Sequence, residues 1–229
     1  MKKLSVTMTH REKLWGWIYY PIQLLLLPFL ISFANAMAGN PLNEAKLNFV
    51  YFLVNFLVIW VIFFHFLKDN GKNALHQPLD CLRFAAVGLI INWGLSYAVQ
   101  LLIAAVSPDF FNVNDASIND MAKENFNLMA VGTVLLVPVA EEALYRGLIF
   151  GQLYNRSRFA AYAVSILVFA AIHVIGYIGM YQPLQLVLCL LQYLPAGIAL
   201  GWAYAKSDTI WAPILIHIFN NWLAVSAMR

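Results

Sequence analysis

Charged residues are scarce in this 229-residue chain, where Asp, Glu, Lys and Arg make up 11% of the sequence, against about 25% in soluble globular domains. Hydrophobic residues make up 62% of it, compared with roughly 45–50% in soluble domains. This composition excludes an ordinary water-soluble protein. Because a membrane-spanning helix needs about 20 mostly apolar residues, the chain can hold at most about eight or nine spans and no separate soluble domain.

Cysteine is nearly absent, with only Cys81 and Cys189, and both lie in or beside apolar stretches. Neither has the CxxC spacing of a zinc site, so we interpret both as packing residues. The formal net charge of +3 is small, and in a membrane protein such an excess reports loop orientation and contact with anionic lipids. Nucleic-acid binding therefore has no support.

Apolar runs separated by polar clusters predict an all-α, polytopic transmembrane helix bundle with about seven spans. The predicted spans are 16–38, 47–67, 82–106, 126–151, 159–180, 183–205 and 208–227. The first span ends in small residues that resemble a signal-peptidase site, but its apolar run is long for a signal peptide. We therefore expect an uncleaved first span in an integral, multi-pass protein.

Basic residues predict the orientation of these spans. If the N-terminus lies in the cytoplasm, every Lys and Arg except Lys46, Lys123 and Arg229 falls on or near the inner side, which favours N-in/C-out. The longest loop, 107–125, is then external. We expect a solvated connector there, with a lid or a substrate-facing segment as the alternative.

The fourth predicted span contains adjacent carboxylates, Glu141 and Glu142, followed by Arg146. Ionisable groups inside a span cost a few kcal/mol each, so each is a candidate functional residue. Successive helical residues lie about 100° apart, so the two glutamates are not expected to share one face. The i,i+4 spacing of Glu142 and Arg146 predicts an ion pair that leaves Glu141 to face a different partner.

Two later spans carry further polar residues at comparable depth. Glu141 lies 15 residues before Arg156, and His173 lies 15 residues after Arg158, so both sit about 20 Å from the inner surface in continuous helices. Asn221 lies 15 residues after Lys206, and His217 is one helical turn shallower. The sequence therefore predicts that Glu141, His173, His217 and Asn221 surround one cavity.

A carboxylate and an imidazole that share a water molecule can remove its proton and make it a nucleophile towards a carbonyl carbon. His217 and Asn221 could then stabilise the oxyanion of a tetrahedral intermediate. Amide hydrolysis is the reaction that uses all four groups. Two histidines and a glutamate could also bind zinc, although the HExxH and HxxEH signatures are absent, so a metal stays open as an alternative.

Three motifs resemble those of the CPBP family, also called the ABI family, of CAAX prenyl proteases and bacteriocin-processing enzymes. The motifs are EExxxR at Glu141 to Arg146, FxxxH at Phe169 to His173, and HxxxN at His217 to Asn221. The resemblance covers residues 126–227 as a catalytic core within a single transmembrane domain, 1–229. Residues 1–125 match only as additional N-terminal spans.

The resemblance implies an intramembrane endopeptidase without a cofactor, in which Glu141 and His173 activate water and His217 and Asn221 form the oxyanion site. It implies supporting roles for four further residues: Glu142, Arg146, Phe169 and Asn220. The implied substrate is a peptide, or a prenylated or otherwise membrane-associated protein tail. The small size resembles bacterial members, which favours a bacterial cell membrane.

Two other function classes remain open from the sequence. A bacteriocin self-immunity or membrane scaffold protein would keep the polar cluster as structural glue and act without catalysis. A small transporter would use Glu141 and the histidines as a proton relay, but no inverted repeat is visible. Gly197 and Gly201 stand four residues apart and could serve dimerisation, although we expect packing within the monomer.

Overall fold

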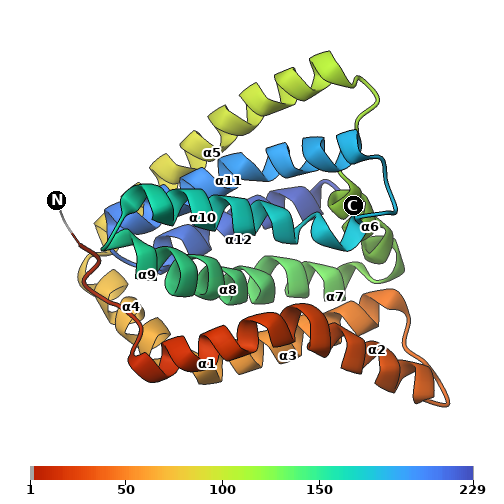
Figure 1. The fold of residues 1–229 in the computed structure, drawn as a ribbon, viewed down its shortest axis with the longest axis horizontal. Coiled ribbons are helices and arrows are strands. Elements are labelled where there is room, and N and C mark those ends of the chain that lie inside the picture. The colour runs from red at the N-terminus through yellow and green to blue at the C-terminus, as the bar shows by residue number, and fades with distance from the viewer. Residues whose placement is uncertain (1–2, 229) are drawn as a thin grey trace.

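The computed structural model describes residues 3–228, and every regular element in that range is helical. Figure 1 shows helices that run between two ends of a bundle, with the N-terminus, α4 and α9 at one end and α6 at the other. The helices are α1 (His10–Pro21), η1 (Ile22–Leu26), α2 (Leu27–Met37), α3 (Glu44–Ile62), α4 (Phe64–His76), α5 (Pro78–Val106), α6 (Val113–Glu124), α7 (Phe126–Val131), η2 (Gly132–Leu136), α8 (Val137–Glu142), η3 (Ala143–Phe150), α9 (Gly151–Tyr154), α10 (Arg158–Ile172), η4 (Ile175–Tyr177), α11 (Pro183–Ser207) and α12 (Trp211–Ser226).

Within residues 3–228, five helices are long and apolar enough to cross a membrane, which confirms the all-α membrane fold. They are His10–Met37, Glu44–Ile62, Pro78–Val106, Phe126–Tyr154 and Pro183–Ser207. Their outward faces carry large apolar side chains, such as Val61 and Leu79, each at 80% exposure. Such faces suit contact with lipid chains. Seven spans and the N-in/C-out orientation stay predictions.

The span predicted at 159–180 is wrong at its C-terminal end, because α10 stops at Ile172 after 15 residues. The chain then makes a short 3-10 turn and passes through Gly179, whose φ of 85° suits glycine and few other residues. His173 is consequently the C-cap of α10 and not a residue in the middle of a span.

Local sequence explains where most helices begin. Thr9 and Glu12 form a capping box at the start of α1, and the side chains of Asn43, Asn112 and Asn125 accept hydrogen bonds from the first turns of α3, α6 and α7. Proline stands at the first position of α5 and α11, where its missing N–H costs nothing.

The centre of the bundle is formed by α11, which packs against α5, α10 and α12. Gly197 permits the close approach of α10, because a Cβ there would lie 3.2 Å from the Cα of Ile166. Gly201 similarly faces Phe150. These glycines therefore serve packing within the monomer, as predicted. Cys81 and Cys189 are buried and unpaired, which agrees with packing roles.

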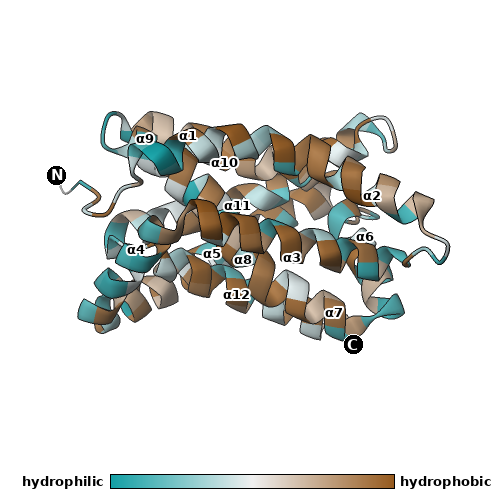
Figure 2. Cartoon of the chain, turned by 90° about the horizontal axis from the view of Figure 1, so that it is seen from below, coloured by the Kyte–Doolittle hydropathy of each residue, from teal (hydrophilic) through white to brown (hydrophobic). Residues whose placement is uncertain are grey.

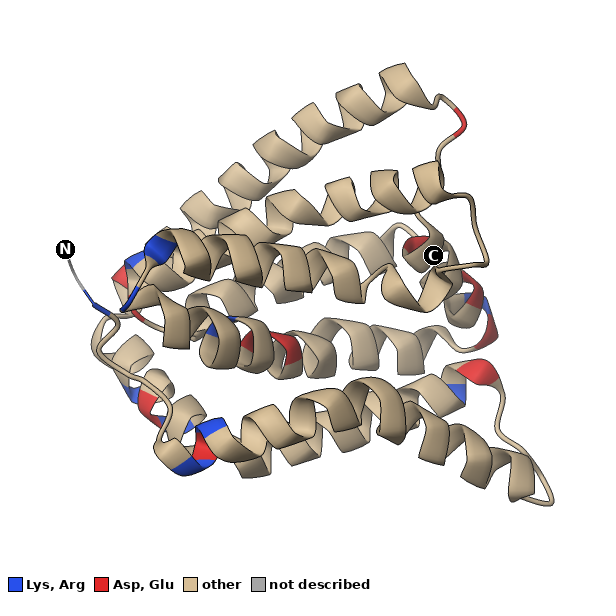
Figure 3. Ribbon diagram, in the orientation of Figure 1, with Lys and Arg blue, Asp and Glu red and all other residues tan. Residues whose placement is uncertain are grey.

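Polarity varies along the bundle. Figure 2 shows hydrophobic residues along the helices and hydrophilic residues gathered at the two ends. In Figure 3, Lys and Arg collect at the end where the N-terminus lies, whereas acidic residues are prominent at the opposite end. This distribution matches the count of basic residues on which the predicted orientation depends.

Candidate active site

The helix that carries the two glutamates changes its winding on either side of them. Pro138, in the first turn of α8, lacks an N–H and follows the π-helical segment η2. A second π-helical segment, η3, begins directly after Glu142 and contains Arg146. Single π-helical turns inside α-helices occur frequently at functional sites, because they displace side chains from the regular helical positions.

Glu142 and Arg146 form the predicted ion pair, and both side chains are completely buried. Arg146 Nη1 donates to Glu142 Oε1 at 3.0 Å. The guanidinium also lies over the ring of Phe169, 4.3 Å from its centroid. Phe169 is itself buried and packs edge-on against Tyr145. The pair thus fixes the rotation of this helix and ties it to α10.

His217 lies between the two glutamates. Its Nδ1 is 2.9 Å from Glu142 Oε1, and its Nε2 is 3.9 Å from Glu141 Oε2. Glu141 thus faces a neighbour other than Arg146, although the same imidazole also contacts Glu142. The two nitrogens of an imidazole point in different directions, so one ring on α12 can reach carboxylates that diverge by about 100°.

His173 is held in one orientation by its backbone and by an aromatic neighbour. Its Nδ1 lies 2.7 Å from the carbonyl oxygen of Phe169, so this nitrogen donates and Nε2 is left as the acceptor in the neutral ring. The ring stacks on Tyr193 with centroids 4.1 Å apart and planes 22° apart. This arrangement presents a single basic nitrogen, as a water-activating histidine requires.

Asn221 and Asn220 bind different neighbours. Asn221 Nδ2 donates to the carbonyl oxygen of Thr133 at 2.8 Å, which leaves its second N–H free to serve another acceptor. Asn220 Oδ1 accepts a hydrogen bond from Trp93 Nε1 at 3.2 Å, which connects α12 to α5. Both asparagines thus hold α12 in place.

A cavity of about 340 Å³ brings the four predicted catalytic residues together, since Glu141, His173, His217 and Asn221 all line it. Phe169 and Asn220 line it as well, whereas Glu142 and Arg146 do not. Glu141 Oε2 is buried and has no hydrogen-bond partner within residues 3–228. No Lys or Arg from the described part of the chain lines this cavity.

The segment 107–125 forms part of this cavity. The leading expectation from its sequence was a solvated connector. Helix α6 supplies Asn114 and Asp115 to the lining. Asn112 Nδ2 donates to Gln192 Oε1 at 2.7 Å, and Asn114 Nδ2 donates to the hydroxyl of Tyr193 at 3.1 Å. The segment therefore forms a wall of the cavity as well as connecting two helices, and its role towards a substrate stays a prediction.

Asp115 keeps an exposed edge, yet the protein around its carboxyl group raises its pKa above the ordinary value by removing water. Nearby His173 and a hydrogen bond from Tyr193 oppose this rise. The sequence reasoning missed Tyr193 altogether. The adjacent polar pair Gln192 and Tyr193 inside an apolar helix was the available signal.

The zinc alternative needs three ligands that converge. Within residues 3–228, no three His, Cys, Asp or Glu side chains are arranged to hold one metal ion. Each active-site histidine also already uses Nδ1 in a hydrogen bond, to Phe169 or to Glu142. We accordingly derive no step of the reaction through a metal.

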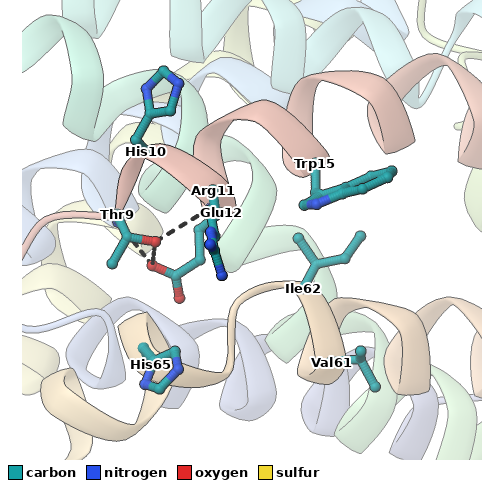
Figure 4. Close-up of a pocket in the computed structure, with 8 residues that line it drawn as sticks. All are labelled: Thr9, His10, Arg11, Glu12, Trp15, Val61, Ile62 and His65. Carbon is teal, nitrogen blue, oxygen red and sulfur yellow. Dashed lines mark hydrogen bonds between the residues drawn. The ribbon is translucent and has the colours of Figure 1, made fainter.

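A larger cavity, of about 490 Å³, lies between the start of α1 and the α3–α4 junction (Figure 4). Its single carboxylate, Glu12, is fully engaged: Oε2 accepts from the backbone and hydroxyl of Thr9, and Oε1 accepts from the N–H of Phe66 at 2.7 Å. Figure 4 shows the carboxylate turned towards Thr9. Glu12 therefore joins two helices and is not available as a base.

Comparisons with known proteins place the site in context. Residues 123–223 match the family model described as type II CAAX prenyl endopeptidase Rce1-like. Over 210 residues the chain is 24% identical to a Bacillus subtilis (strain 168) protein with the provisional name membrane peptidase YdiL, and the alignment covers 88% of this chain and 81% of that one. No solved structure matches the chain significantly.

Proposed function

We propose that the chain is a CAAX-type membrane endopeptidase of the CPBP kind in which Glu141 activates the attacking water. The match of residues 123–223 to the Rce1-like model supports the protease class. One observation carries this proposal. Glu141 Oε2 is buried without a hydrogen-bond partner in the described chain, in a cavity that His173, His217 and Asn221 also line. An unpaired carboxylate oxygen beside two imidazoles is suited to receive a proton from water.

The reaction begins with a water molecule between Glu141 and Nε2 of His173. Glu141 takes one proton while the water oxygen forms a bond to the carbonyl carbon of the substrate. The carbonyl π electrons move to its oxygen, which becomes the oxyanion of a tetrahedral intermediate. Glu141 then returns the proton to the amide nitrogen as the carbon–nitrogen bond breaks and the oxyanion electrons re-form the carbonyl. The new carboxylic acid gives its proton to the departing amine, so that a carboxylate and an ammonium group leave.

The oxyanion accepts hydrogen bonds from two residues on α12. Asn221 supplies the N–H of its side chain that Thr133 does not use. His217 faces the cavity with Nε2 because Glu142 binds its Nδ1, and it donates when Nε2 carries a proton. Such donors act most strongly where a bound substrate excludes water from the cavity. Glu142 and Arg146 support the reaction by holding His217 in place.

The charges that line the cavity limit which substrate tails it can accept. A peptide tail with its terminal carboxylate in the cavity would find no Lys or Arg along the described lining, and it would meet Asp115 and Glu141 instead. This favours a scissile bond whose neighbours are neutral or basic. We propose a membrane-associated peptide or protein tail as the substrate, and leave the need for a prenyl group to experiment.

The experiment is a cleavage assay on purified protein in lipid, with a mixed library of membrane-tethered peptides that includes prenylated and unprenylated tails. Wild type is compared with His173→Ala, His217→Ala and Asn221→Ala, each with and without a zinc chelator. Mass spectrometry of the products identifies the cleaved bond. Chelator-resistant cleavage that falls in all three variants supports the proposal.

Glu44→Gln is the matched control, since Glu44 is an exposed carboxylate in the first turn of α3, away from the cavity. It should cleave as wild type does. Cleavage that a chelator abolishes and zinc restores would replace the metal-free mechanism. If wild type cuts nothing in the library while the protein is folded, a non-catalytic immunity or scaffold role becomes the better account.

A further inference from the structure

A third cavity, of about 290 Å³, lies near the N-terminal end of the bundle and shares no lining residue with the active site. It is bounded by the segment before α1, the start of α1, the end of the glutamate-bearing helix and Tyr204 on α11. We call it the basal cavity. The proposed protease mechanism uses none of its residues.

Two buried hydrogen-bond donors face the basal cavity without partners. Tyr204 is 1% exposed, and its hydroxyl makes no hydrogen bond to any residue in the range 3–228. The side-chain nitrogen of Gln152 is also buried and unpaired within the described chain. Buried polar groups in native proteins are nearly always hydrogen-bonded. Two such donors at one cavity indicate an acceptor that binds there.

The cations at this cavity make the expected acceptor an anion. Lys13 and Arg156 line it, and none of the described lining residues is Asp or Glu. The acidic residue Asp208 does not line the cavity, and its carboxylate accepts a hydrogen bond from the N–H of Ser5 at 2.8 Å. The C-terminus of α11 adds about half a negative charge, which two full positive charges outweigh.

The backbone leaves room above the tyrosine hydroxyl. A Cβ atom at Gly151 would lie 3.7 Å from the Tyr204 oxygen and 3.3 Å from the carbonyl oxygen of Arg146. Glycine at this position thus keeps the approach to the hydroxyl open. A larger side chain would occupy the space in which an acceptor oxygen must lie to bind Tyr204.

The basal cavity lies at the level where a bilayer presents its headgroups. Lys13 is in the first turns of the span His10–Met37, and Arg156 follows the span Phe126–Tyr154 by two residues. This is the end of the bundle at which Lys and Arg collect in Figure 3. Phospholipid phosphates lie at such span ends, and basic pockets between helices there bind anionic headgroups.

We propose that the basal cavity binds a phosphate group, which Lys13 and Arg156 attract and to which Tyr204 and Gln152 donate hydrogen bonds. The group belongs either to an anionic phospholipid or to free phosphate. Nothing covalent happens at the site. Its occupancy would tie α1, the glutamate-bearing helix and α11 together at the end opposite α6.

The test uses the delipidated full-length protein in a non-ionic detergent. Native mass spectrometry measures the binding of phosphatidylglycerol and phosphatidylcholine, and equilibrium dialysis measures the binding of radiolabelled inorganic phosphate. We expect phosphatidylglycerol to bind at least tenfold more tightly than phosphatidylcholine if the source is a lipid. If the source is free phosphate, the dialysis arm shows the binding and the lipid arm shows no preference.

Two variants test the assignment of residues. Tyr204→Phe removes one neutral hydrogen bond and should weaken anion binding about fivefold, whereas Lys13→Gln combined with Arg156→Gln should weaken it at least tenfold. The controls are Tyr162→Phe and Lys206→Gln, a tyrosine and an exposed lysine that do not line the cavity. Both controls should bind within twofold of wild type. The proposal is overturned if neither anion binds wild type, or if the two test variants bind it as wild type does.

Discussion

The buried ion pair between Glu142 and Arg146 gives the sharpest stability prediction. Both side chains have zero exposure, and their charged atoms are 3.0 Å apart. Arg146→Met keeps most of the side-chain volume and removes the charge, so Glu142 is left buried with His217 as its remaining partner. Breaking a buried pair in this way costs about 3–5 kcal/mol. Loss of the contact with Phe169 adds up to about 2 kcal/mol.

A double-mutant cycle separates the pair from its surroundings. Glu142→Gln leaves Arg146 without its carboxylate and should cost about 3–5 kcal/mol as well. The double variant contains neither charge, so its cost should fall below the sum of the two single costs by about 2–3 kcal/mol. The free energy of unfolding is measured by titration with sodium dodecyl sulfate in mixed micelles, with helix content followed by circular dichroism.

Lys123 and Asp120 provide the matched control. They form an ion pair of 2.7 Å on α6, but their side chains are 66% and 74% exposed. Because water screens such a pair, Lys123→Met should cost less than about 1 kcal/mol. The reasoning is refuted if Arg146→Met costs no more than Lys123→Met does, or if the two changes at Glu142 and Arg146 are additive.

Three further predictions concern α6 and helix packing. Tyr193→Phe keeps the stacking on His173 but loses the hydrogen bonds to α6, so limited proteolysis should cut residues 113–124 faster while His173 stays in place; equal cutting rates would contradict this. The folded protein raises the pKa of Asp115 above its ordinary value of 3.8, because burial disfavours the carboxylate. The protonated side chain therefore stabilises the folded state below pH 3.8, and this stabilisation is lost as the pH rises through the higher pKa of the folded state. Asp115→Asn should therefore raise the melting temperature at pH 7 and not at pH 3, and an equal effect at both would count against it. Gly197→Val should destabilise the bundle by about 1–3 kcal/mol in the same detergent titration, because its side chain meets the backbone of Ile166, and a neutral result would disprove this close approach.

Part of the site follows from the sequence because it depends on local geometry. The Glu142–Arg146 pair depends only on i,i+4 spacing, which η3 preserves well enough to form the bond. The shared depth of Glu141, His173 and Asn221 follows from the rise per residue of helices that start at basic residues. From the spacing and the rise per residue alone, the polar groups could be predicted to lie near one another, with no information on which helices are in contact.

Other features depend on contacts between distant segments and lay outside such reasoning. The meeting of both glutamates at His217 depends on where α12 packs against α8. The early end of α10 was hidden because residues 174–180 are largely apolar and resemble a continuing span. The role of α6 depends on Asn112 and Asn114, which bind α11 residues about 80 positions away.

The central claim is that Glu141 is the base that activates water. The most direct test is the cleavage rate at saturating substrate for Glu141→Gln, which keeps the shape of the side chain and removes its basicity. The account predicts a fall of at least about 10³-fold, with unchanged helix content and unfolding midpoint, while Glu44→Gln keeps the wild-type rate. A folded Glu141→Gln protein that cleaves the same bond at a wild-type rate would contradict the account.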